Sequence, residues 1–172
     1  MPSLAESFRG RTLSPARAVL LGTLAVGVLD GLDAVLFFGA RGVAPIKIFQ
    51  SIASGILGRA AFGGGVPAAL LGFVLHFFIA FCIVLTYFLA SRRLPALTRY
   101  AAEMGVLYGL VVYEVMNEVV LPLSNAGAGP RPIPVLVNGL LIHVLAVGLP
   151  SALFARGATP PPERTPAPAV AL

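Results

Sequence analysis

The chain has 172 residues, of which 58% are hydrophobic and 11% are charged, and its formal net charge is +5. A soluble globular domain carries about 25% charged residues, so this composition excludes an ordinary soluble protein. The length allows one compact domain, and the chain has no basic run with interleaved aromatic residues of the kind that binds nucleic acid. A single cysteine, Cys82, excludes an internal disulfide and a cysteine-based zinc site.

Four apolar stretches are long enough to cross a membrane. About 20 helical residues, each rising about 1.5 Å, match a hydrocarbon core of about 30 Å. We therefore predict an all-α integral membrane protein, a four-transmembrane-helix bundle within residues 16–156. The predicted spans cover residues 16–38, 66–90, 101–121 and 134–156, and Pro122 is expected to end the third. Residues 1–15 are predicted to be a cytoplasmic tail, and the proline-rich residues 157–172 a disordered one.

The first connection, residues 39–65, contains a shorter helical pattern. Its apolar residues recur at helical spacing after Pro45, which suits a first helical turn: Ile48, Phe49, Ile52, Ile56 and Leu57. The run is too short to span a bilayer. We expect a short interfacial or re-entrant helix in the first external loop, either capping the bundle or acting as a gate.

The positive residues predict the orientation. Lys and Arg accumulate in cytoplasmic loops. The N-terminal segment, the loop between the second and third spans, and the C-terminal region contain eight of the twelve, and the other two loops contain four. This distribution predicts that both termini are cytoplasmic.

Two pairs of glycines have the spacing that allows helices to pack closely. Gly27 and Gly31 lie in the first span, and Gly105 and Gly109 lie in the third. Small residues four apart let two helix backbones approach in a membrane. We expect these pairs to pack helices within one chain or between two copies.

Every predicted span carries an ionisable group. Such groups are costly in a membrane, so they normally face the bundle interior and have a partner. With alternate spans running outward and inward, four groups fall within roughly 5 Å of the midplane: Asp30, His76, Glu114 and His143. A layer roughly 8–10 Å out on the same side contains Asp33, Glu118 and Asn138, with Asn117 beside Glu118. We predict an intramembrane polar cluster of these eight residues.

Three functions are compatible with such a cluster. Chains of Asp, Glu and His form proton relays in transporters, which points to proton-linked or small-solute transport. The groups could instead hold helices together in a structural or accessory subunit of a homo-oligomer or larger membrane assembly. The third hypothesis is a metal or haem site, for which the candidate ligands are His76, His143, Asp30 and Glu114.

Catalytic motifs are not evident in the sequence. The serines lack an adjacent His and acid in a recognisable arrangement, and no glycine-rich loop carries the Lys-Ser/Thr pair that binds phosphate. We therefore name no catalytic residue.

Several strings in the chain resemble segments of small uncharacterised bacterial four-span inner-membrane proteins. They are QSIASGILGRAAFGGG (50–65), LHFFIAF (75–81), YEVMNEVVLPLS (113–124) and GLLIHVLAVGLP (139–150). The resemblance implies a multi-pass protein of the bacterial inner membrane. It implies no activity, and no residue role follows from it.

Overall fold

The structure is a computed structural model that describes residues 12–127, 129 and 131–160. All the regular structure in these residues is helical, and four helical stretches are long and apolar enough to cross a membrane. The prediction of an all-α protein with four helices long and apolar enough to cross a membrane is confirmed. Most of both predicted tails, residues 1–11 and 161–172, lies outside the described residues.

The first and second spans are continuous helices, whereas the third and fourth are each built from three segments. The first two are α2 (Pro15–Gly39) and α4 (Gly65–Ser91). The third comprises α6 (Ala101–Val115), η2 (Met116–Val120) and α7 (Leu121–Leu123). The fourth comprises α8 (Ile133–Ile142), η3 (His143–Gly148) and α9 (Leu149–Gly157). The remaining helices are α3 (Pro45–Leu57), η1 (Gly58–Gly63) and α5 (Ala96–Arg99).

Two π-helical turns, η2 and η3, interrupt the third and fourth spans shortly before Pro122 and Pro150. Proline lacks the N–H that would bond the carbonyl four residues earlier, and a wider turn accommodates the loss. The expectation that Pro122 ends the third span is wrong, because the helix continues through it to Leu123. The two turns contain three of the predicted polar-cluster residues, so the prolines influence where those side chains point.

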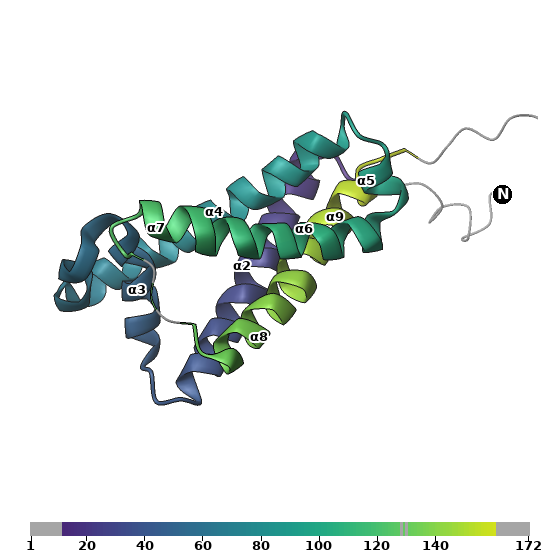
Figure 1. Cartoon of the computed structure of the whole chain (residues 1–172). Helices are drawn as coiled ribbons and strands as arrows, with labels where there is room; N and C mark the ends of the chain where they lie inside the picture. The colour runs from purple at the N-terminus through teal and green to yellow at the C-terminus, as the bar shows by residue number, and fades with distance from the viewer. Residues whose placement is uncertain (1–11, 128, 130, 161–172) are drawn as a thin grey trace, which may run out of the picture.

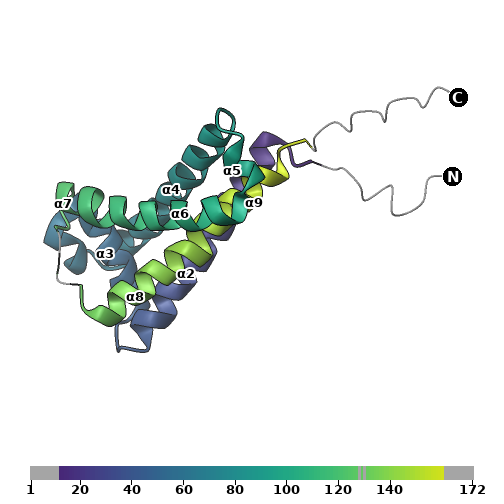
Figure 2. The same cartoon turned by 45° about the vertical axis from the view of Figure 1, so that its right-hand side comes forward.

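The spans pack together near the termini and spread apart at the opposite end. In Figures 1 and 2, α2 runs beside α8 and α9, while α4 and α6 each lie at an angle to them. Helix α4 packs mainly on α2 and α3, and α6 mainly on the fourth span. A buried cluster closes the narrow end: Ala18, Val19, Tyr87, Phe88, Ala101, Ala152, Ala155 and Ala158. Large apolar side chains such as Leu20, Val74 and Leu141 are exposed on the outside, the pattern expected of helices that would contact lipid. The wide end is therefore where the bundle has room for a site.

Helix α3 occupies the first connection and packs along α4. The backbone carbonyl of Phe49 lies so close to Gly72 that no β-carbon would fit there. Gln50 and Ala53 are buried in this contact. The short predicted helix therefore exists and is joined to the bundle, whereas its placement at a membrane interface or as a re-entrant segment stays a prediction.

Glycines bring the third and fourth spans into backbone contact. A β-carbon on Gly109 would collide with the backbone of His143 and Val144, and one on Gly148 with the backbone of Gly105 and Gly109. Gly105 and Gly109 are therefore used inside one chain, as the first of the two packing options predicted.

We expect Gly109→Ala to destabilise the protein by about 1–3 kcal/mol, the usual cost of overpacking a tight contact. The measurement is the free energy of unfolding in mixed detergent micelles. Gly39→Ala is the control, because a β-carbon at Gly39 meets no atom within 4 Å. Equal stability of the two variants would contradict this account of the helix contact.

Candidate functional site

A cavity of about 400 Å³ lies between the spreading spans. Helices α2, α3 and α4 and the third and fourth spans all contribute to its wall. The wall is mainly apolar and contains these polar side chains: Asp30, Ser51, His76, Asn117, Ser124 and His143. Binding sites for small molecules have this character, with a few polar groups placed in an apolar cavity of about 300–1,000 Å³.

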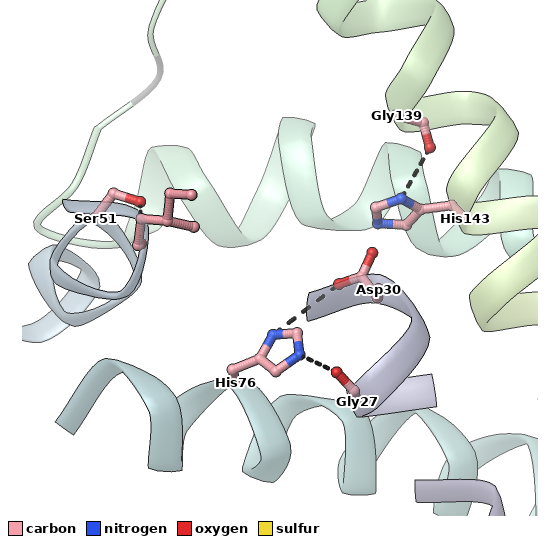
Figure 3. A network of polar contacts seen from close by, with 7 residues as sticks. Gly27, Asp30, Ser51, His76, Gly139 and His143 are labelled. Atoms are coloured by element: carbon pink, nitrogen blue, oxygen red, sulfur yellow. Dashed lines mark hydrogen bonds and ion pairs between the residues drawn. The ribbon is translucent and has the colours of Figure 1, made fainter. Parts of the chain in front are cut away.

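Asp30 of α2 and His76 of α4 face each other in this wall. The Asp30 Oδ2 and His76 Nδ1 atoms are 4.0 Å apart, and the two side chains are 27% and 12% exposed. This separation is too long for a direct hydrogen bond, so a proton exchanged between them needs an intervening water or a small movement of Asp30. Figure 3 shows the Asp30 carboxylate lying between the imidazole rings of His76 and His143.

The hydrogen bond of the second ring nitrogen determines the tautomer of His76. Nε2 lies 2.7 Å from the backbone carbonyl oxygen of Gly27. A carbonyl only accepts hydrogen bonds, so Nε2 carries a proton and donates it. The nitrogen free to gain or lose a proton is therefore Nδ1, which faces Asp30. Close packing at α2 makes this possible, because a β-carbon on Gly31 would lie 3.0 Å from Nε2 and one on Gly27 would collide with Phe77.

His143 is held in the same manner from the other side of the cavity. Its Nδ1 donates to the Gly139 carbonyl oxygen 2.9 Å away, which leaves Nε2 as the nitrogen without a fixed proton. The Tyr113 ring packs edge-on against the imidazole, with ring centroids 5.3 Å apart. Both histidines thus keep one nitrogen available for proton exchange.

A smaller cavity of about 220 Å³ adjoins the first, and Asp30, Asn117 and His143 contribute to both. Here Asn138 donates a hydrogen bond from Nδ2 to Asp33 Oδ2 at 2.7 Å. The smaller cavity therefore joins the predicted outer layer to the Asp30 site.

Glu118 forms a hydrogen-bonded ion pair with Arg131. Their side chains are 54% and 34% exposed, and the carboxylate raises the pKa of Arg131. Arg131 also lines the smaller cavity, so its charge at that cavity is neutralised by Glu118.

Asn117 and Glu114 point in different directions. Asn117 lines the main cavity and donates a hydrogen bond to the Tyr113 carbonyl at 2.8 Å. Glu114 is exposed on the outer surface of α6, and among the described residues it has no hydrogen-bond or ion-pair partner. The structure therefore groups Asp30, His76, His143 and Asn117, places Asp33 and Asn138 beside them, and leaves Glu114 outside the group.

The predicted metal ligands are not assembled. Within residues 12–127, 129 and 131–160, no three His, Cys, Asp or Glu side chains lie close enough together to hold a metal ion. The position of Glu114, exposed on α6, removes one member of the predicted set.

Sequence reasoning missed three polar side chains of the site, Ser51, Ser124 and Arg131. Ser51 belongs to α3 and lines the main cavity because α3 packs against the bundle. The helical spacing of the apolar residues in α3 does not predict this packing. Arg131 lies at the smaller cavity and pairs with Glu118. The signal for Arg131 was available, since it is the only cation in the third loop, a few residues before Asn138.

No protein-family model, curated protein or solved structure matches this chain. The resemblance to small bacterial four-span proteins stays a prediction.

We expect the Asp33–Asn138 hydrogen bond to give a coupling energy of about 0.6 kcal/mol and at most about 1.7 kcal/mol, the range measured for such bonds in membrane helices. The test is a double-mutant cycle of Asp33→Ala and Asn138→Ala, read by unfolding in detergent. A parallel cycle of Glu114→Ala and Asn138→Ala should give a coupling near zero. Equal coupling in the two cycles would contradict the placement of these side chains.

Proposed function

We propose that this chain is a multi-pass membrane protein that exchanges a proton for a small cationic solute in the Asp30–His76 cavity. The observation that supports this most strongly is the orientation of His76: Nε2–H is fixed by Gly27, so Nδ1 faces the Asp30 carboxylate. The pair holds one exchangeable proton between two groups in a partly buried, apolar setting. Histidine and carboxylate chains of this kind form proton relays in membrane proteins.

Charge balance favours a cation as the exchanged solute. The titratable groups at the main cavity are Asp30, His76 and His143, and Asp33 and Arg131 lie at the adjoining one. Arg131 is neutralised by Glu118, so the acids dominate when both histidines are neutral. A bound cation beside Asp30 repels the proton on His76 Nδ1, which leaves to the water of the cavity. One positive charge enters as one proton leaves, so the net charge of the site is unchanged.

The shape of the bundle gives the exchange a direction. The site lies in the wide half, and the buried cluster that includes Tyr87 and Phe88 closes the narrow half near the termini. With both termini in the cytoplasm, as the charge distribution predicts, the described conformation faces outward. Transport then requires the narrow end to open while the wide end closes, as in alternating-access carriers.

Reconstituted vesicles containing a pH-sensitive dye test the exchange. We use tetramethylammonium, whose fixed charge keeps it from crossing lipid in a neutral form. Addition of this cation outside vesicles loaded with acidic buffer should drive protons outward through the unmodified protein. Asp30→Asn should abolish the coupled flux while the protein remains folded, because an amide neither ionises nor attracts the cation.

Glu103→Gln is the control for this experiment. Glu103 is also an acid, but it lies in the first turn of α6, away from the cavities. Its variant should transport like the unmodified protein. Proton flux that persists in Asp30→Asn, or that falls equally in Glu103→Gln, would overturn the proposed exchange at Asp30.

The position of Glu114 favours a second candidate function, a subunit of a membrane assembly. An exposed carboxyl group near the middle of a span has a high cost in lipid. A second copy would lower that cost if the two Glu114 side chains met and shared a proton in a hydrogen bond. The same face of α6 exposes Leu107 and Leu110, which would pack around that contact.

We expect Glu114→Leu to weaken self-association in the bilayer about tenfold, since intramembrane hydrogen bonds in model helices contribute about 1–2 kcal/mol. Energy transfer between fluorescently labelled copies at rising protein-to-lipid ratios measures this. Val74→Leu, at a similarly exposed position on α4, away from this face, should associate like the unmodified chain. Unchanged association of Glu114→Leu would contradict this candidate.

A further inference from the structure

We propose that the cation exchanged at Asp30 is the head of an amphiphile, whose apolar chain lies in a groove between α4 and α6. This inference rests on the function proposed above and names its substrate class: a single-chain amphiphile with a positively charged head, entering from the bilayer.

The groove is a second cavity of about 390 Å³, with a wall of apolar side chains from both helices. From α4 it is lined by residues such as Ile79, Cys82 and Ile83, and from α6 by Val111 and Val115. Val111 and Val115 are 48% and 45% exposed, so the groove reaches the outer surface of the bundle. In a membrane that surface faces lipid.

The groove is continuous with the polar cavity. Four residues line both spaces: Ile79, Ile83, Met116 and Val120. A molecule could therefore place one end beside Asp30 and the other end between α4 and α6. The weak direct packing of these two helices leaves this space, while each packs more extensively on another element, α4 on α2 and α3, and α6 on the fourth span.

The polar groups on the groove are already satisfied within the chain. Thr86 donates its hydroxyl hydrogen bond to the Cys82 carbonyl, and Tyr108 donates to the Ile83 carbonyl, both at 2.7 Å. Neither hydroxyl has its proton free for a ligand, so the groove suits a hydrocarbon chain better than a polar one. Where the groove meets the main cavity, Asp30 and its neighbours provide polar and charged groups that suit a cationic head.

The groove lets the charged head reach Asp30, but it adds little to the binding free energy of the amphiphile. Lipid tails are as apolar as the groove wall, so a chain gains little hydrophobic free energy by leaving the bilayer for the groove. Its benefit is that the chain stays in an apolar medium while the charged head leaves the interface and reaches Asp30. The position of the chain is therefore the decisive observable.

The test uses decyltrimethylammonium with a photoreactive diazirine at the chain end, bound to the full-length protein in lipid vesicles. Illumination should attach the probe to residues of the groove, such as Cys82 and Val115, and peptide mass spectrometry locates the attachment. Asp30→Asn should lose this labelling, because the head no longer has an acid to pair with.

A groove-filling variant provides the matched comparison. Val115→Trp should lose both the labelling and the proton exchange driven by decyltrimethylammonium, while exchange driven by tetramethylammonium is retained. Val119→Trp is the control, since Val119 is similarly exposed at 47% but does not line the groove. It should behave like the unmodified protein.

The outcomes separate this inference from the proposed function. Labelling scattered over the outer surface, or unaffected by Asp30→Asn, overturns the amphiphile while tetramethylammonium exchange still supports a cation exchanger. Oxidative cross-linking of Cys82 between two copies, with no labelling, shows that a second copy fills the groove and also overturns it. If neither cation drives proton flux, the proposed function fails, and the amphiphile inference fails with it.

Discussion

The hydrogen bond from His76 Nε2 to the Gly27 carbonyl determines what the Asp30 site can do. Because this bond keeps a proton on Nε2, only Nδ1 can exchange one, and Nδ1 faces the single carboxylate of the main cavity. The bond depends on α2 presenting no side chain at Gly31, where a β-carbon would lie 3.0 Å from Nε2. The missing side chain at Gly31 of α2 thus leaves room for the hydrogen bond that selects the tautomer of His76 on α4.

The shape of the bundle follows from two opposing tendencies. Glycines allow the backbones of the third and fourth spans to touch, and small residues of a buried cluster pack the helices together at the end near the termini. At the other end, α3 packs beside α4 and adds Ser51 to the wall of the space between the spreading helices. The π-turns before Pro122 and Pro150 contain two side chains of the main cavity, Asn117 and His143, so these irregular turns orient both side chains. Irregular turns of this kind are frequent at functional sites in helices.

Much of this arrangement could be predicted from the sequence, because membrane insertion leaves a strong record in it. Apolar length identified the four spans, and the cost of burying charge identified Asp30, His76 and His143. Counting the rise per residue gave each group its depth, but depth does not give the direction around the helix axis. On an ideal helix Glu114, Asn117 and Glu118 share one face, whereas the π-turn that begins at Met116 interrupts this register, and only Asn117 lines the main cavity. The packing of α3 and the ion pair of Arg131 depend on contacts between distant segments, which periodicity does not report.

The central claim is that His76 exchanges its proton at Nδ1, beside Asp30, and that a bound cation displaces this proton. Nitrogen NMR of selectively labelled histidine in lipid bilayers reports the two ring nitrogens separately. We predict that Nε2 of His76 carries a proton both with and without the cation, and that tetramethylammonium removes the proton from Nδ1 at constant pH. A neutral His76 ring that carries its proton on Nδ1, or a ring that does not respond to the cation, would contradict the account.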